Sequence, residues 1–142
     1  MRKILLTGAN GQLGRAIRQV YRDEADFILT DMIDADGFRK LDISDLSAVQ
    51  QCLSETHPDS VINCAAMTNV DGCEQNIEGA FRANAVGPRN LAIATEAAQI
   101  RLVHVSTDYV FPGTERNEAY TEFDRPAPLL AYGRTKLAGE EF

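Results

Sequence analysis

The sequence has few cysteines, no long hydrophobic run and fewer basic than acidic side chains. There are three cysteines, Cys52, Cys64 and Cys73, and their spacing matches neither a C-x-x-C pair nor a zinc site. We therefore expect no disulfide and no metal site. Cys64 is predicted to be a small buried side chain. No stretch approaches the roughly 18 apolar residues of a membrane span. The N-terminal run Ile4-Leu5-Leu6 is too short for a signal peptide, so we expect a cytoplasmic protein. The net charge of −7 argues against binding to nucleic acid.

The remaining composition is that of an ordinary globular domain, because 44% of the residues are hydrophobic and 25% are charged. A length of 142 residues suits a single domain. Short apolar runs rich in β-branched residues alternate with longer segments of helical periodicity, which is typical of βαβ units around a parallel sheet. We therefore predict a doubly wound, Rossmann-like α/β fold, with strands at residues 3–7, 26–30, 60–64 and 102–106 and a weaker one at 38–41.

The segments between these strands indicate helices. Apolar residues recur at helical spacing at positions 13, 17 and 20–21 and again at 46, 49 and 53, and Ser44 or Asp45 is suited to cap the second helix. Residues 74–99 are expected to form one long helix, with Gly79 and Gly87-Pro88 near bends or a break. Prolines at 112, 126 and 128 predict a long functional loop over residues 107–131, and a last helix starts near Leu130.

A glycine-rich turn follows the first strand and opens the next helix, with the spacing G-x-x-G-x-x-G. Gly8 permits a tight turn, Gly11 lets backbone amides approach a diphosphate, and Gly14 allows close packing of the helix. The N-terminus of the helix would then face the anion. The pattern therefore predicts a dinucleotide site, and the alternative is a tight turn that binds nothing.

Several other candidates lie at the carboxyl ends of predicted strands, where open α/β sheets bind their ligands. Asp31 ends the second strand, twenty residues beyond Gly11, where a carboxylate can accept hydrogen bonds from a ribose and would repel a 2′-phosphate. This position favours NADH over NADPH, although Asp31 could instead cap a loop. Asp42-Ile43 and Ala65-Ala66 follow two further strands, and without the glycine turn the two alanines would suggest mere packing.

Near the end of the chain, Tyr132 and Lys136 are four residues apart, so on a helix their side chains project from one face. A nearby cation favours the ionised form of a phenol, which suits a tyrosine to proton transfer. Ser106 and Thr107 end the last strand, where a hydroxyl can hold a substrate carbonyl against the tyrosine. Taken alone, the pair could be a surface aromatic beside a solvated lysine, and Ser-Thr could be a cap. His57 and His104 receive no role, because a satisfied core or sheet histidine explains them.

Two strings, T-G-A-N-G-Q-L-G at 7–14 and Y-G-R-T-K at 132–136, make the chain similar to the extended short-chain dehydrogenase/reductase superfamily. Within it, C-A-A-M-T-N-V-D-G-C-E at 64–74, S-T-D-Y-V-F-P-G at 106–113 and Y-G-R-T-K-L-A-G-E at 132–140 resemble the dTDP-4-dehydrorhamnose reductase family. The resemblance runs through all 142 residues. It implies an oxidoreductase of dTDP-rhamnose biosynthesis that uses NADH or NADPH to reduce the 4-keto group of a nucleotide-linked deoxysugar.

The resemblance also implies roles for individual residues. Thr107, Tyr132 and Lys136 would be catalytic: Tyr132 protonates the C4 carbonyl oxygen, and Lys136 holds the ribose and tunes the tyrosine. Thr107 and Asp108 would meet the sugar nucleotide. The implied cofactor contacts are Gly11, Gln12 and Leu13 to the pyrophosphate, Asp31 to the adenosine ribose, Asp42 and Ile43 at the adenine end, and Ala65, Ala66, Met67 and Val105 at the nicotinamide.

One departure from the family pattern is that only six residues follow Lys136. The resemblance therefore implies a single NAD(P)-binding domain over residues 1–142, without the C-terminal part of the usual fold and the substrate lobe, and weak or absent turnover by these residues alone. Other expectations are a nucleotide-sugar substrate, no membrane partner and a possible homodimer. Two alternatives stay open: another extended reductase, epimerase or dehydratase acting on a nucleotide sugar, and a non-enzymatic cofactor-binding regulatory subunit like that of methionine adenosyltransferase.

Overall fold

A parallel five-stranded sheet forms the centre of the protein, in a computed structural model that describes residues 1–114 and 118–142. The strand order is β3-β2-β1-β4-β5, which confirms the predicted Rossmann-like arrangement. The strands are β1 (Arg2–Thr7), β2 (Ala25–Asp31), β3 (Arg39–Lys40), β4 (Ser60–Asn63) and β5 (Arg101–His104). Leu5 of β1 lies opposite both Ile28 and Val61, so the most apolar strand is at the centre. Strand β5 ends at His104, two residues earlier than expected.

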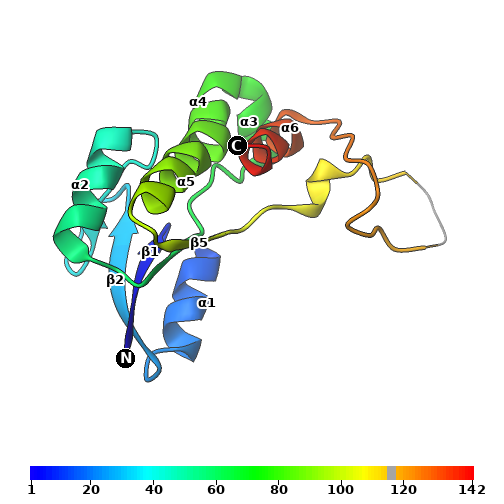
Figure 1. Ribbon diagram of the computed structural model, residues 1–142. Helices are drawn as coiled ribbons and strands as arrows, with labels where there is room; N and C mark the ends of the chain where they lie inside the picture. Colours follow the sequence, from blue (N-terminus) through cyan, green and yellow to red (C-terminus); the bar gives the residue numbers. More distant parts are fainter. Residues whose placement is uncertain (115–117) are drawn as a thin grey trace.

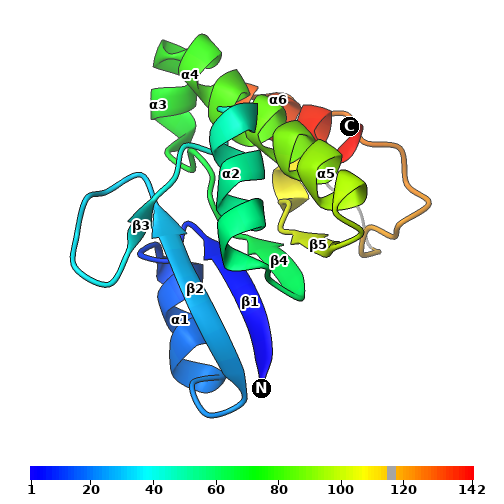
Figure 2. The same cartoon turned by 60° about the vertical axis from the view of Figure 1, so that its left-hand side comes forward.

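Helices cover both faces of this sheet (Figures 1 and 2). Helix α1 (Gln12–Val20) lies on one face, and α2 (Leu46–Thr56) and α5 (Gly87–Ala97) lie on the other. The main core forms between the second face and its helices and includes Leu5, Val61, Val49, Leu53 and Leu91. Asp45 caps α2 as predicted, since its side chain accepts a hydrogen bond from the Ala48 amide.

The predicted single helix over residues 74–99 is wrong in detail. The chain forms α3 (Val70–Gln75), α4 (Ile77–Phe81), a π-helix η1 (Arg82–Val86) and then α5. The break falls at Asn76, whose extended backbone ends α3 and whose side chain caps α4 through the Gly79 amide at 2.9 Å. Pro88 lies in the first turn of α5, where the missing amide hydrogen costs little. Local capping by asparagine therefore decided the break.

Helix α6 (Ala131–Glu140) begins one residue after Leu130, close to the predicted start. The long loop before it is confirmed in its described part and contains only a short 3₁₀ helix, η2 (Asp108–Val110), while residues 115–117 lie outside the described residues. A second, smaller core joins α3, α4 and α6 through Cys73, Ala80 and Ala131. In the parts of the chain that the structure describes, no helix is both long and apolar enough to cross a membrane.

Candidate active site

In the glycine turn between β1 and α1, the backbone at Gly8 lies close to the backbone of Ala65, and the backbone at Gly14 lies close to that of Gly8. Gly8 has a φ of +62°, and a Cβ placed there would lie 2.6 Å from the amide nitrogen of Ala65. A Cβ on Gly14 would meet the Gly8 carbonyl oxygen at 2.5 Å, so this glycine lets α1 pack on the turn itself. Gly11 is less crowded, since its Cβ would meet only the Gly8 oxygen at 3.2 Å, and it caps α1 without a side-chain hydrogen bond. The turn thus leaves the positive end of the α1 dipole open to an anion.

Two adjoining cavities, of about 470 and 560 Å³, open at the carboxyl ends of the strands and share Gly8, Gly11, Cys64 and Ala66. Volumes of this size suit small molecules. We call the first the glycine-turn end of the cleft; its other lining residues include Asp31, Leu41, Asp42, Ile43, Ser44, Ala65, Met67 and Arg82. We call the second the tyrosine–lysine end; it is also lined by Gln12, Leu13, Gly14, Val105, Ser106, Tyr132 and Lys136.

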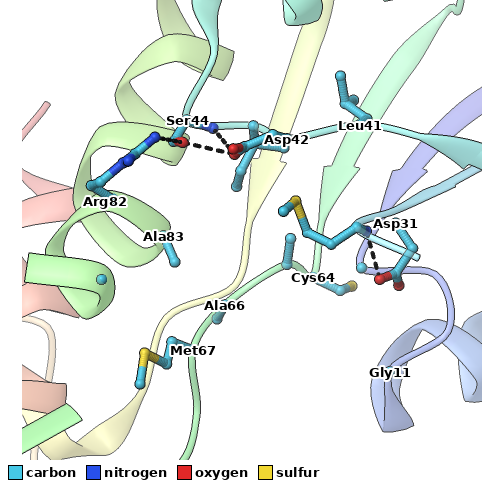
Figure 3. A pocket seen from close by; sticks show the side chains of 15 residues that line it. Gly11, Asp31, Leu41, Asp42, Ser44, Cys64, Ala66, Met67, Arg82 and Ala83 are labelled. Atoms are coloured by element: carbon cyan, nitrogen blue, oxygen red, sulfur yellow. Dashed lines mark hydrogen bonds between the residues drawn. The ribbon is translucent and has the colours of Figure 1, made fainter. Parts of the chain in front are cut away.

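Polar groups at the glycine-turn end are tied to backbone and to one another (Figure 3). The Asp31 carboxylate accepts hydrogen bonds from the amides of Asn10 at 2.9 Å and Met32 at 2.8 Å. Asp42 accepts from the amide and hydroxyl of Ser44, and the Ser44 hydroxyl accepts from the guanidinium of Arg82 at 3.1 Å. Arg82 had no place in the sequence analysis, and Ser44 was considered there only as a helix cap. Arg82 comes from the π-helix, so no local motif pointed to it.

Tyr132 and Lys136 project from α6 into the tyrosine–lysine end, as the i, i+4 spacing predicts. The half-buried Tyr132 ring meets the ring of Tyr109 edge to face, with centroids 5.6 Å apart. Lys136 is 2% exposed, and its ammonium donates to the Val105 carbonyl at 2.6 Å. Burial lowers the pKa of Lys136, while the charges of Glu140 and Cys64 act in the opposite direction. The pair therefore stands at the cleft wall, with its cation removed from bulk water.

Buried polar contacts from distant segments hold α6 in this place. Asn84 of the π-helix accepts from the Met67 amide at 2.8 Å and donates to the Met67 carbonyl and to the Thr135 hydroxyl. The Glu74 carboxylate accepts from the amide of Ala131 at 2.6 Å, at the first turn of α6. The sequence analysis missed both residues. Asn84 could have been noticed because it lies inside a helical pattern, where asparagine is unfavourable unless its side chain has a specific partner.

Thr107 and Asp108 lie beside the cleft rather than in its walls, because neither lines the two cavities described above. Thr107 caps η2 by accepting from the Tyr109 amide at 3.2 Å. Ser106 lines the tyrosine–lysine end instead, and its hydroxyl donates to Glu140 of α6. The expectation that Cys64 is buried is wrong: it is half-buried and lines both cavities, whereas Cys52 and Cys73 are buried.

His104 of β5 is a satisfied sheet histidine, as the sequence suggested, yet it lies beside Lys136. Its Nδ1 is 2.9 Å from the Asn63 side-chain nitrogen, and its Nε2 is 3.5 Å from the Lys136 nitrogen. Burial, with a smaller effect of the Lys136 charge, lowers the pKa of His104 from 6.5 to about 4. The ring is therefore neutral at physiological pH.

Several known proteins of similar sequence and fold are named reductases. The chain is 42% identical over 139 residues to dTDP-4-dehydrorhamnose reductase of Mycolicibacterium smegmatis, a match that covers 98% of the chain and 40% of that protein. A crystal structure of a dTDP-4-dehydrorhamnose reductase of Clostridium acetobutylicum superimposes with a TM-score of 0.89 at 48% identity, over 98% of this chain and 48% of that one. The crystal structure of the Bacillus anthracis enzyme in complex with NADP superimposes with a TM-score of 0.88 at 42% identity. This match covers 99% of this chain and 48% of that one.

The chain thus spans about half the length of the relatives it matches. A family model, described as the RmlD substrate binding domain, matches residues 1–142. The matched residues include the glycine turn, the strand ends that line the cleft, and the Tyr132–Lys136 pair. The chain belongs to the RmlD substrate binding domain family.

Proposed function

We propose that this chain forms the coenzyme-binding part of an NADH- or NADPH-dependent reductase that converts dTDP-4-dehydrorhamnose to dTDP-L-rhamnose. One observation carries the proposal: Tyr132 and Lys136 line the same cavity as the glycine turn, although they come from opposite ends of the sequence. The relatives that bear the name dTDP-4-dehydrorhamnose reductase support the choice of substrate.

The residues present fit a dinucleotide. Gly8 and Gly11 have no side chain that would stop a diphosphate from reaching the N-terminus of α1, and a Cβ at Gly8 would collide with Ala65. The two cavities adjoin at this turn, so one elongated ligand can occupy both. The residues that would hold it are Gly8, Gly11, Gln12, Leu13 and Gly14 at the diphosphate, Asp31, Asp42 and Ile43 at the adenosine, and Ala65, Ala66, Met67, Val105, Tyr132 and Lys136 at the nicotinamide half.

A reduced nicotinamide supplies a hydride when it is bound, and the residues of this chain supply the proton and the positioning. The O–H bond of Tyr132 breaks as its proton passes to the C4 carbonyl oxygen, which becomes the hydroxyl of the product. The Lys136 ammonium favours the phenolate that remains. Thr107, the cap of η2, would donate its hydroxyl to the same carbonyl oxygen, and Asp108 would contact the sugar nucleotide.

The carboxylate of Asp31 favours NADH over NADPH. It lines the glycine-turn end, where a 2′-phosphate would meet a like charge. The NADP bound in the Bacillus anthracis relative indicates that the family scaffold accepts the phosphate as well, so both coenzymes belong in the test. With this function we also propose a cytoplasmic location and a homodimeric assembly, which cell fractionation and light scattering would check.

Titration of NADH and NADPH into the chain, followed by nicotinamide fluorescence, tests the coenzyme. We expect saturable binding, and about tenfold weaker binding in Gly11→Ala, because the added methyl group obstructs the diphosphate without disturbing the fold. Any oxidation of NADH with dTDP-4-dehydrorhamnose should fall at least about 100-fold in Tyr132→Phe, while coenzyme affinity stays nearly constant.

Failure of both coenzymes to bind would overturn the proposal. NAD that copurifies tightly and is recycled would instead indicate an epimerase or dehydratase. Weak or absent turnover is expected of these 142 residues alone, so the comparison with a regulatory protein needs a protein of the relatives' full length. In that protein, coenzyme binding without oxidation by any keto-sugar would indicate a regulatory protein.

A further inference from the structure

A chain of hydrogen bonds crosses three strands and ends at His104, whose Nε2 lies beside Lys136. Thr7 of β1 donates to the Asn63 side-chain oxygen at 2.5 Å, and the Ala65 amide donates to the same oxygen at 3.1 Å. Asn63 is 1% exposed. A backbone N–H can only donate, so the atom that faces Ala65 must be the amide oxygen of Asn63. The Asn63 side chain therefore has one allowed orientation, with its NH₂ group directed toward β5.

This orientation decides the proton position on His104. The Asn63 NH₂ group donates to His104 Nδ1 at 2.9 Å, so Nδ1 must present a lone pair. A neutral imidazole then carries its single proton on Nε2, the atom that lies 3.5 Å from the Lys136 nitrogen. A doubly protonated ring would place N–H against N–H at Asn63. Burial lowers the pKa of His104 to about 4, in agreement with a ring that stays neutral.

We propose that His104 is a positioning residue, held by Asn63 as the neutral Nε2-protonated ring, so that an N–H group rather than a lone pair faces the amine of Lys136. This inference rests on the proposed function only for the role of Lys136. An ammonium has three donors and no acceptor, so His104 offers it no hydrogen bond, whereas the lone pair of a neutral amine can accept from Nε2. The ring thereby favours the neutral amine and makes the charge of Lys136 depend on acceptors in the cleft.

Other groups face Lys136 from the elements packed around it. Glu140, one turn further along α6, and Cys64, after β4, favour the charged form, and burial opposes it. The Val105 carbonyl after β5 accepts one hydrogen of the ammonium at 2.6 Å. Tyr132 lines the same cavity from α6. His104 is the group in this set that presents a donor where an acceptor could stand, so its tautomer acts together with burial against the charged form of Lys136.

Nitrogen NMR of the 142-residue chain tests the inference, because the sequence has only two histidines and three lysines. We expect long-range nitrogen–proton spectra at neutral pH to show His104 protonated on Nε2 and bare on Nδ1. In Asn63→Asp, a carboxylate oxygen faces Nδ1, so the proton should move to Nδ1. The lone pair of Nε2 then faces Lys136, and the titration midpoint of the Lys136 side chain should rise.

His104→Gln should also raise this midpoint, because its amide can turn an oxygen toward the amine. The double variant Asn63→Asp/His104→Gln measures the effect of the added charge alone, and His57→Gln is the control that should change nothing at Lys136. The Lys136 signal is assigned by its loss in Lys136→Met. A wild-type His104 protonated on Nδ1, or an unchanged Lys136 midpoint in His104→Gln, would overturn the inference.

The wild-type spectrum decides the tautomer even if a variant fails to fold. Measurement of NADH affinity on the same samples separates the two proposals. If neither coenzyme binds, the proposed function is contradicted and the tautomer result is unaffected. If coenzyme binds but His104 is protonated on Nδ1, only the proposed role of His104 is contradicted.

Discussion

The two ends of the cleft are built in different ways. The glycine turn, which lines both ends, is made by neighbouring residues of the chain, and close backbone contacts at Gly8 and Gly14 shape it. The tyrosine–lysine end depends on side chains far apart in sequence: Asn84 bonds Thr135 across 51 residues, and Glu74 bonds Ala131 across 57. The glycine turn therefore tolerates almost no added atoms. The tyrosine–lysine end is also crowded at Gly133 and Gly139 of α6, where a Cβ would meet backbone oxygens, and it depends in addition on its buried polar partners.

The largest effect is expected for Gly8→Ala, which attacks the glycine-turn end. The new methyl group would meet the Ala65 backbone at 2.6 Å in a left-handed backbone conformation. We expect a loss of about 4 kcal/mol in the free energy of unfolding and no measurable coenzyme binding. Gly37→Ala is the matched control, because Gly37 also has a positive φ but no atom within 4 Å of its Cβ, and it should cost only about 1 kcal/mol. Equal losses in a urea titration would contradict the crowding argument.

Asn84→Ala should break the opposite end. The substitution leaves the amide and carbonyl of Met67 without their buried partner and should cost about 2–3 kcal/mol in chemical denaturation. Because the glycine turn is untouched, we expect the chain to keep weak coenzyme binding while the nicotinamide half becomes more mobile in fluorescence anisotropy. Asn69→Ala, which removes the cap of α3 at an exposed site, is the control and should cost about 1 kcal/mol. A larger loss of unfolding free energy in Asn69→Ala than in Asn84→Ala would contradict the idea that Asn84 holds α6 in place.

The stability of the protein should depend on pH through His104, which lies beside Lys136 of the tyrosine–lysine end of the cleft. The folded state lowers the pKa of His104 from 6.5 to about 4, so between these values the unfolded chain binds more protons than the folded one. The contribution of the ring to stability is therefore complete above pH 6.5 and is lost as the pH falls toward 4. Because solvent screens the half-buried ring, we expect a loss of about 1–2 kcal/mol. His104→Gln should abolish this part of the acid destabilisation, and His57→Gln should leave it intact.

The smallest effect concerns coenzyme choice at the glycine-turn end. Asp31→Asn keeps one oxygen as an acceptor for the Met32 amide, loses the acceptor of the Asn10 amide and removes the negative charge from the cleft. We expect the preference for NADH over NADPH to fall by roughly fivefold, which corresponds to about 1 kcal/mol for one charge pair near water. Asp34→Asn, on the exposed loop that follows, is the control for net charge. Equal changes in coenzyme preference in Asp31→Asn and Asp34→Asn would mean that Asp31 acts only through the net charge of the protein.

Local patterns predicted one end of the site better than the other. The glycine turn and the i, i+4 placement of Tyr132 and Lys136 on α6 depend on neighbouring residues, and the structure has both where they were expected. The ends of β1, β2 and β4 lie within one residue of the predicted ends. The break at Asn76 and the π-helix were missed, because asparagine capping and a shifted helical register compete with a continuous helix by small energies. Ser106 rather than Thr107 lines the cleft, because β5 ends two residues early.

By itself, the sequence determined the parallel Rossmann-like sheet and the turn at Gly8, because hydrophobic periodicity and the conformational freedom of glycine act over a few residues. Only the tertiary structure decided that Asn63 orients His104 beside Lys136 and that Asn84 joins α6 to the Met67 loop. The physical reason is that hydrogen-bond direction and burial depend on which distant groups meet, and the chain settles this when the strands align and the helices pack on them.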